Sequence, residues 1–428
     1  MTQSTSDLHR TVLLGADGFI GRHLAYGLRD LGHTVVCVAR NPTALMEMGF
    51  ETLTADFLDP TVQSSDFWKE KLKTVDHVVN AAGLLNGSER TFTAVHVTTP
   101  RAVYSAMPKG ATGVLISAVG IDADTDFSKY RRAGETTALA HNVTALRCGL
   151  VLSDTSYGGS SLIRALAACP IAMPVPSGAA PQFNPIHATD LAGVIDAVLR
   201  HPPTSNPIDV GGPETVSLHT LLSQYRRWLG LPKAPIITLP SPLMSLFGWI
   251  GDFCKMGPIS RTSLAQINAG VMADTTAMHA EIDASPRGFS RFLNARPVGT
   301  SDLWHARLFL MKPAVRLCLA VLWLISGLIG LMLPPDQFLP LLNTAIPDNV
   351  LVAMARTGGV IDLFIALALI RDWHPKRITQ LQFAMIIGYT ATFSLLNPTL
   401  WLLPLGGLLK NIPIVALLLI HAILQKER

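Results

Sequence analysis

The chain has 428 residues, of which 49% are hydrophobic and only 15% are charged, and its formal net charge is +4. An ordinary soluble domain carries roughly 25% charged residues, so part of this chain is expected to be solvated by something other than water. Lys and Arg form no stripe that could follow phosphates, and the five cysteines show no CxxC or Cys/His pattern, so neither nucleic acid nor a metal centre is predicted.

From Thr11 to about Arg147, short apolar runs alternate with helical stretches. The runs are TVLLGA, HTVVCVAR, VDHVVNAAG, GVLISAVG and VTALRCG. Each is short, rich in β-branched residues and apolar throughout, which is typical of parallel strands buried on both faces. Residues 1–150 are therefore predicted to form an α/β domain with a doubly wound parallel sheet of the Rossmann type.

A glycine-rich turn joins the first of these runs directly to a helix. Gly15 and Gly18 allow a tight turn and a close approach to a pyrophosphate, and Gly21 lets the helix pack against the strand. The N-terminus of the helix would face the negative charge. The predicted dinucleotide site at this turn comprises Gly15, Asp17, Gly18, Phe19, Ile20, Gly21 and Arg22.

The second run ends in Arg40, where an NAD-binding enzyme would carry an acidic residue for the ribose 2′-hydroxyl. A guanidinium at this place attracts a 2′-phosphate, and Arg22 could join it. The alternative is that both arginines are solvated surface residues. NADP(H) is favoured over NAD(H) as the cofactor.

Residues 151–300 are richer in Pro and Gly and are predicted to form a smaller substrate lobe, partly woven with the core. A helix is expected to begin at Thr189 or Asp190, and His187 is interpreted as structural rather than catalytic. The apolar stretch from Ser241 to Phe253 is expected to be a core helix of this lobe, with a helix on a membrane surface as the alternative.

Residues 301–428 are predicted to form an all-α domain of four transmembrane helices. Each candidate span is close to the roughly 20 residues that a bilayer core requires. The predicted spans are Pro313–Leu333, Leu351–Ile370, Ile378–Leu396 and Leu400–Leu424. Arg356, Asp362 and Lys410 fall within them and are expected to find partners away from lipid, either in a buried ion pair or at a site for a lipid-soluble substrate.

The charges that flank these spans predict their orientation. Basic residues precede the first span, fill the loop between the second and third, and end the chain, whereas the first loop holds only Asp336 and Asp348. The polar start of the chain has no apolar segment typical of a cleaved signal peptide. The positive-inside rule therefore predicts a multi-pass protein of the inner membrane, with both termini and the Rossmann domain in the cytoplasm.

Several further segments resemble the extended and atypical short-chain dehydrogenase/reductase superfamily, in particular the branch of the nucleotide-binding accessory subunit of respiratory complex I. They are ADFLDP at 55–60, VVNAAG at 78–83, LRCGLVLS at 146–153 and NPIHATDLA at 184–192. The resemblance implies that Asp56 contacts the adenine. The cofactor set that it implies further contains Phe57, Asn80, Ala81, Ala82, Gly83 and Ser117. LWLISGLIGL, GGVIDLFIALAL and LLKNIPIVALLL similarly resemble the DoxX-like membrane family.

Active members of that superfamily use a Tyr-x-x-x-Lys pair, in which the lysine helps the tyrosine to exchange a proton with the substrate. Here Tyr130 has Gly134 four residues later. If the following Ala-Gly-Glu sets the register, Phe127 takes the tyrosine position and Arg131 the lysine position. The predicted catalytic positions Tyr130, Arg131 and Phe127 are therefore degenerate, and ordinary alcohol chemistry is not expected.

Three functions are compatible with this pattern. The preferred hypothesis is a membrane-anchored NAD(P)(H)-binding oxidoreductase-like protein that acts on or senses a hydrophobic, quinone-like substrate. The alternative is a catalytically silent nucleotide-binding module that serves assembly or redox sensing in a membrane complex. A sugar-nucleotide epimerase or dehydratase is disfavoured by the missing Tyr-Lys pair and by the membrane segment.

Overall fold

The computed structural model describes residues 9–177, 181–342 and 344–425. It divides into two compact units, the first formed by Met1–Gly248 with Ser260–Leu303 and the second by Trp249–Ile259 with Trp304–Arg428. Lys426 and Arg428, which contributed to the predicted orientation, lie outside the described residues.

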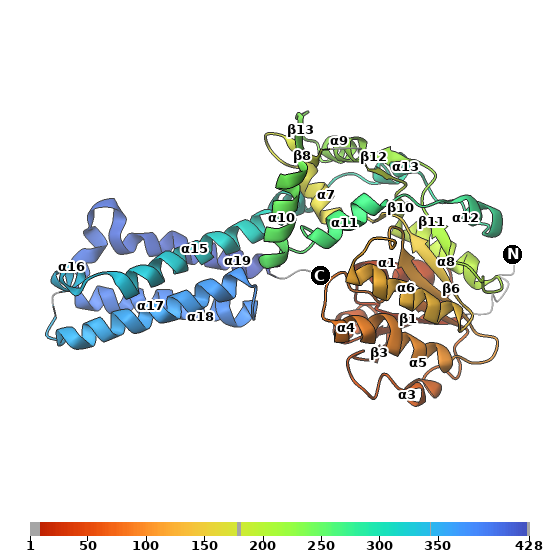
Figure 1. Cartoon of the computed structure of the whole chain (residues 1–428), viewed down its shortest axis with the longest axis horizontal. Helices are drawn as coiled ribbons and strands as arrows, with labels where there is room; N and C mark the ends of the chain where they lie inside the picture. The colour runs from red at the N-terminus through yellow and green to blue at the C-terminus, as the bar shows by residue number, and fades with distance from the viewer. Residues whose placement is uncertain (1–8, 178–180, 343, 426–428) are drawn as a thin grey trace. The chain divides into compact units, whose positions relative to one another are not determined.

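A seven-stranded sheet forms the centre of the first unit (Figure 1). Its order is β11-β6-β5-β4-β1-β2-β3, and every neighbouring pair is parallel. The chain builds outward from β1 through β2 and β3 and then returns to place β4 on the other side of β1, so ligands are expected at the carboxyl ends of β1 and β4. The predicted doubly wound sheet is confirmed. The strands are β1 (Arg10–Leu14), β2 (Thr34–Ala39), β3 (Glu51–Thr54), β4 (His77–Asn80), β5 (Thr112–Ala118), β6 (Val143–Cys148) and β11 (Ile208–Val210).

Helices cover both faces of this sheet. Successive side chains of each strand point to opposite faces, and each face packs in its own hydrophobic cluster. Leu13, Val35 and Val79 pack in one cluster, with α1 (Phe19–Asp30), α2 (Thr43–Glu47) and α8 (Ala188–Leu199). Val12, Val36 and Val78 pack in the other. The second face is covered by α3 (Ser65–Lys69), α5 (Thr99–Ser105) and α6 (Asp126–Leu139), and a π-helical turn (Ala94–Thr98) joins α4 (Glu89–Thr93) to α5.

The segment after β6 contributes β11 and α8 to the core and also builds a small lobe with its own apolar cluster around Leu221, Tyr225 and Phe289. Helix α8 begins at Ala188, and the side chain of His187 caps it by accepting a hydrogen bond from the amide of Thr189. The structural interpretation of His187 is confirmed, but the prediction of Thr189 or Asp190 as the helix start is wrong. The lobe elements are β7 (Val151–Leu152), α7 (Gly159–Ala167), β8 (Met173–Pro176), β9 (Gln182–Phe183), β10 (Ile186–His187), β12 (Val216–Ser217), α9 (Leu218–Trp228), β13 (Ile236–Leu239), α11 (Arg261–Ala269) and α13 (Phe289–Leu293). Helix α12 (Thr276–Glu281) packs instead in the first hydrophobic cluster through Met278.

Helix α10 (Ser241–Phe253) corrects a further prediction. It is not a core helix, because Leu246, Phe247, Trp249 and Phe253 are all exposed. The buried positions of the helix are glycines: a Cβ at Gly248 would lie 2.9 Å from the Leu264 side chain and one at Gly251 would lie 1.8 Å from the Ile259 carbonyl oxygen. The helix thus packs through its backbone and turns its large apolar side chains outward, as a membrane-surface helix would.

Long apolar helices make up most of the second unit. Three segments of the described chain are long and apolar enough to cross a membrane: α15 (Met311–Met332), α17 (Asp348–Ile370) and Gly407–Leu424. The third predicted span is helix α18 (Pro375–Leu396), which is long enough but is diluted by Thr379, Gln380 and Gln382, and it is not among those three. The fourth was predicted to begin too early, because two 3-10 segments (Pro398–Leu402 and Pro404–Lys410) precede α19 (Asn411–Leu424). The remaining elements are α14 (Thr300–Phe309), α16 (Pro335–Phe338) and a 3-10 turn (Leu339–Leu341).

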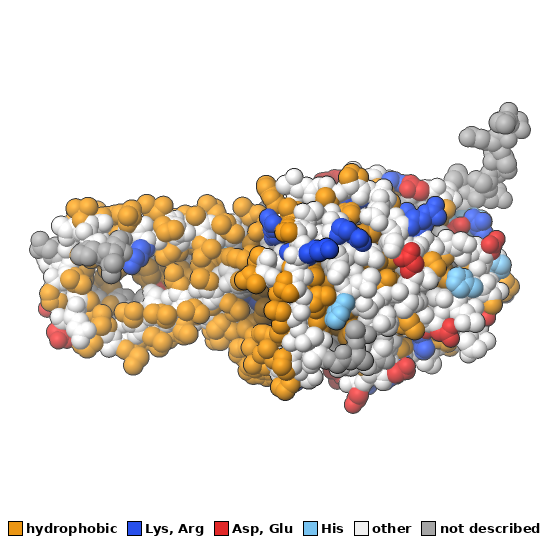
Figure 2. Space-filling model, turned by 90° about the horizontal axis from the view of Figure 1, so that it is seen from above, with side chains coloured by type: hydrophobic (Ala, Val, Ile, Leu, Met, Phe, Trp, Pro, Cys, Tyr) orange, Lys and Arg blue, Asp and Glu red, His pale blue; other side chains and the backbone are white. Residues whose placement is uncertain are grey.

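Apolar side chains predominate on the face of these helices that Figure 2 shows in orange. Val321, Ile325 and Leu367 are each more than half exposed. The helices α15 and α17 meet through glycines: a Cβ at Gly327 would lie 2.9 Å from the carbonyl oxygen of Gly359. The interior of the unit, by contrast, contains buried polar side chains such as Asp362 and Gln382. This distribution suits a surface solvated by lipid.

Candidate functional site

The glycine turn after β1 is held in a conformation that needs glycine. Gly15 has φ +71°, and a Cβ there would lie 2.7 Å from the Cα of Ala82. A Cβ on Gly21 would lie 2.1 Å from the carbonyl oxygen of Gly15. Gly18 is exposed and is the N-cap of α1, and none of the described side chains caps the helix there. The first amides of α1 are therefore free to face an anion at the switch point of the sheet.

The other residues of this turn have mixed surroundings. Ile20 packs partly against the first hydrophobic cluster, while the ring of Phe19 lies 5.4 Å from that of His23 and 6.3 Å from that of Tyr157. Asp17 and Arg22 are half-buried. The turn thus combines Ile20, which packs against the core, with the half-buried polar side chains of Asp17 and Arg22.

Polar residues also follow β2 and β3. Arg40 comes directly after β2 and is exposed, and within the described residues the structure shows no hydrogen bond or ion pair for it. Asp56 follows β3 and is also exposed, and its Oδ1 accepts a hydrogen bond from the amide of Leu58 at 3.0 Å. Phe57, in contrast, is 8% exposed and packs in the second hydrophobic cluster, so the structure places it in the core and not at the mouth of the site.

The end of β4 forms the opposite wall of the site. Asn80 is buried, donates to the Tyr104 hydroxyl at 2.8 Å and accepts from the amide of Ala82 at 3.1 Å. Its side chain therefore holds the end of the strand, because both of its polar atoms are occupied within the protein. Ala81 is half-buried and Ala82 is buried, while Gly83 is exposed. A Cβ on Gly83 would lie 2.7 Å from Nη2 of Arg131, which brings α6 to this wall.

Arg131 lies at the position that the Ala-Gly-Glu register assigns to the family lysine. It is 8% exposed, its Nη1 donates to the carbonyl oxygen of Ala82 at 3.4 Å, and its Nε has no partner among the described residues. His96 lies nearby, and burial together with the Arg131 charge lowers the pKa of His96 to about 3. The imidazole is therefore neutral, and Arg131 is the cationic group at this wall.

Tyr130 faces another direction. Its ring stacks on Phe92 with centroids 5.4 Å apart, and its hydroxyl donates to Glu89 at 3.1 Å. Phe127 is 7% exposed and packs in the same apolar cluster as Phe92 and Tyr130. The structure thus brings Arg131, and not Tyr130, to the Ala82–Gly83 wall.

Two residues beside this wall, Glu135 and Arg147, were missed as site residues by sequence reasoning. The Ser117 hydroxyl donates to Oε1 of Glu135 at 2.5 Å, and Arg147 donates to the same carboxylate, with Nη2 2.8 Å from Oε2. The hydrogen bond to Glu135 raises the pKa of Arg147. Glu135 appeared in the sequence only as the marker of the register, and nothing in the spacing linked it to Arg147.

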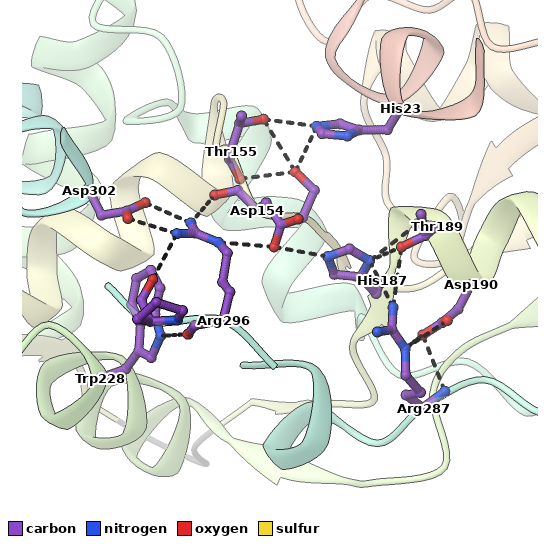
Figure 3. A network of polar contacts seen from close by, with 12 residues as sticks. His23, Asp154, Thr155, His187, Thr189, Asp190, Trp228, Arg287, Arg296 and Asp302 are labelled. Carbon is purple, nitrogen blue, oxygen red and sulfur yellow. Dashed lines mark hydrogen bonds and ion pairs between the residues drawn. The ribbon is translucent and has the colours of Figure 1, made fainter. Parts of the chain in front are cut away.

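A second polar network, shown in Figure 3, joins α1 to the lobe. His23 lies 2.9 Å from the Ser153 hydroxyl and 2.8 Å from that of Thr155. Arg296 then binds Asp154 at 3.1 Å and Asp302 at 2.7 Å. These residues come from segments far apart in the chain, so no local pattern could have revealed them.

The same network extends to the start of α8. Nε2 of His187 lies 3.7 Å from Asp154, and Arg287 binds Asp190 at 2.9 Å (Figure 3). Burial lowers the pKa of His187, and its Nδ1 already accepts from the amide of Thr189. The imidazole is therefore a neutral linker and helix cap. Within the described residues, no group of three His, Cys, Asp or Glu side chains could hold a metal ion.

Comparison with known proteins identifies both parts of the chain. Residues 11–114 match the NAD dependent epimerase/dehydratase family, and residues 320–419 match the DoxX-like family. The first unit is thus a Rossmann-type domain, and its residues 11–114 are similar to the NAD dependent epimerase/dehydratase family. The chain joins this domain to a DoxX-like membrane domain, and together with its apolar helices this marks it as a membrane protein.

Solved structures share the fold at low identity. A UDP-glucuronic acid 4-epimerase from Bacillus cereus, in complex with UDP-glucuronic acid and NAD, is 16% identical with a TM-score of 0.50 and covers 70% of this chain and 99% of its own. A dTDP-glucose 4,6-dehydratase from Bacillus anthracis, in complex with NAD, is 15% identical with a TM-score of 0.52 and covers 70% and 97%. The epimerase Mth375 from Methanothermobacter thermautotrophicus is 13% identical with a TM-score of 0.51 and covers 71% and 94%. No curated protein matches the chain.

Proposed function

We propose that this protein is a membrane-anchored, NAD(P)(H)-binding oxidoreductase-like protein that acts on, or senses, a hydrophobic, quinone-like substrate. The proposal rests on two residues of α6, Arg131 and Phe127. Arg131 presents a buried cation beside Gly83, and in the Ala-Gly-Glu register Phe127 takes the place of the family tyrosine. A dinucleotide would then bind beside Arg131, with no tyrosine among the described residues of the Ala82–Gly83 wall to protonate a ketone.

The described residues fit a nicotinamide dinucleotide. The uncapped amides of α1 at Gly18 would hold the pyrophosphate, and the exposed Asp56 would accept from the adenine amine. Arg131, whose Nε has no partner among the described residues, would bind the nicotinamide ribose. When bound, such a cofactor supplies a hydride.

NADP(H) is the preferred form in this proposal. Arg40 is exposed at the end of β2, at the place that meets the adenosine ribose in this fold, and Arg22 is half-buried in the first turn of α1. Two guanidinium groups there favour a 2′-phosphate over a bare hydroxyl.

A hydrophobic substrate is supported by the membrane unit. It contains a cavity of about 320 Å³. Its lining includes Ile329, Leu333, Phe338, Ala355, Phe393 and Leu400, which are all apolar. An open apolar pocket in a lipid-facing unit suits the ring and chain of a lipid-soluble compound.

The proposed location is the inner membrane, with several spans and with both termini and the NAD-binding domain in the cytoplasm. Arg316 lies near the start of α15, Arg371 directly follows α17, and Lys376 and Arg377 lie in the first turn of α18. The other end of α17 begins with Asp348. This asymmetry supports the orientation that the positive-inside rule gives.

The second candidate is a catalytically silent nucleotide-binding module of a membrane complex. It is favoured by one observation: the only tyrosine of α6, Tyr130, is engaged with Glu89 and Phe92 and does not face the Ala82–Gly83 wall. In this case the dinucleotide would be held as a structural or sensing ligand.

One experiment separates the two candidates. The full chain, purified in detergent, is titrated with NADPH and NADH, and NADPH oxidation is then followed with short-chain quinones and with a panel of ketones. Turnover with quinones that is lost in Arg131→Ala but kept in Tyr130→Phe supports the oxidoreductase. Dinucleotide binding without any turnover supports the silent module, and the absence of dinucleotide binding refutes both.

A further inference from the structure

Asp362 is a buried carboxylic acid inside the membrane unit. It lies in the interior of α17 and is 2% exposed. The Ser326 hydroxyl of α15 lies 2.6 Å from its Oδ2, and the Tyr389 hydroxyl of α18 lies 2.9 Å from its Oδ1. Both partners are neutral, and the part of the chain that the structure describes offers Asp362 no ion pair.

The neighbouring charged and titratable groups are engaged elsewhere or exposed. Arg356, on the same helix, donates to the carbonyl oxygens of Gly330 and Leu333 at 2.8 Å each. Arg316 of α15 pairs with Asp372 at 2.9 Å, and His421 of α19 lies 3.3 Å from Gln425. Lys410 is exposed. The buried ion pair expected between charges of the spans is therefore not formed by Asp362.

A carboxylate at membrane depth is costly when ionised and without a cation, so a proton is its simplest means of neutralisation. A hydroxyl group can donate or accept a hydrogen bond. The two contacts can therefore serve both forms of Asp362. Both hydroxyls donate to the ionised form, and the protonated form donates to one hydroxyl while accepting from the other.

A second polar residue lies in the same interior. Gln382 is fully buried, its Oε1 accepts from the Trp323 indole at 3.0 Å, and its Nε2 has no partner among the described residues. It lies seven residues, or about two helical turns, before Tyr389, so both belong to one face of α18. This unpaired donor is a second polar group in the interior of the unit.

We propose that Asp362 is a proton-binding site of the membrane unit, which takes up and releases a proton between the hydroxyls of Ser326 and Tyr389. This role does not depend on the dinucleotide function proposed above. Its ligand is the proton itself, and its structural requirement is a carboxyl group that is stable in both forms.

Labelling with dicyclohexylcarbodiimide tests the proposal, because this apolar reagent reacts with protonated carboxyl groups within membranes. The carboxyl oxygen adds to the carbodiimide carbon, the carboxyl proton passes to nitrogen, and rearrangement leaves an N-acylurea that retains every atom of the reagent. The full chain in phosphatidylethanolamine and phosphatidylglycerol vesicles is labelled over a range of pH, and the modified peptide is located by mass spectrometry. We expect labelling of Asp362 at acid pH that is lost as the pH rises, and no labelling of Asp372, which is paired with Arg316.

Two variants probe the hydroxyls. Tyr389→Phe and Ser326→Ala each remove a donor to the ionised form, so labelling should persist to a pH higher by about one unit or more. Thr390→Val is the matched control, because among the described residues the Thr390 hydroxyl bonds the carbonyl oxygen of Ile386 and the Asn411 amide and not Asp362. An unlabelled Asp362 at every pH would overturn the proposal, and so would labelling that does not change with pH.

Discussion

The exposed arginine at the end of β2 offers the sharpest test of cofactor choice. Arg40 forms no hydrogen bond or ion pair with the described residues, so its replacement removes no such interaction among them. A charge-assisted bond to a phosphate contributes about 1.5–3 kcal/mol when well formed, and solvent screening at an exposed site reduces this to roughly 1–2 kcal/mol. Arg40→Asp should therefore weaken NADPH binding by about 5- to 30-fold and leave NADH binding unchanged or improved.

The assay is a fluorescence titration of the full chain with each dinucleotide at low and high salt. Arg101→Asp is the matched control, because Arg101 is exposed on α5 and the change in net charge is the same. The NADPH loss should shrink at high salt, since the interaction is electrostatic. Equal losses for NADPH and NADH, or the same loss in the control, would show that Arg40 does not contact the ribose phosphate.

Three further outcomes are expected. Phe127→Tyr combined with Arg131→Lys should create weak NADPH-dependent ketone reduction, measured as NADPH consumption, whereas Tyr130→Phe should leave dinucleotide affinity within about twofold of the native value. Folding lowers the pKa of His96 from 6.5 to about 3, so its contribution to stability is present above pH 6.5 and is lost as the pH falls. Near pH 5 the free energy of unfolding should have fallen by on the order of 2 kcal/mol. Thermal unfolding measures this loss, which should be absent in His96→Phe. The full chain should resist carbonate extraction, whereas a truncation ending at Gly299 should be released; release of the full chain would contradict the assignment of its spans.

Much of the first unit could be predicted because its signals are local. The five apolar runs became β1, β2, β4, β5 and β6, since uniform burial on both faces leaves a clear mark in the sequence. The glycine turn was equally readable, because Gly15 and Gly21 have close backbone neighbours that exclude any side chain.

Other features depend on contacts between distant segments. Phe57 was grouped with Asp56 by its motif, but alternation along the chain turns it into the core. The cap of α8 is His187 and not Thr189 or Asp190, and its ring also lies 3.3 Å from Nη2 of Arg287, which is 100 residues away. In α10 the apolar composition suggested burial, yet it is the glycines that pack.

The glycine contact between α15 and α17 has a consequence for how much variation these helices can tolerate. A Cβ on Gly327 would meet the Leu363 side chain at 2.8 Å, and one on Gly359 would meet the amide nitrogen of Leu331 at 3.0 Å. An added methyl group would therefore force the two backbones apart, and Ser326 would move away from Asp362. The side of α17 that faces α15 therefore cannot accept a residue larger than glycine at Gly359. On the lipid-facing side, Leu367 is 60% exposed, so one apolar residue can replace another there at little cost in stability.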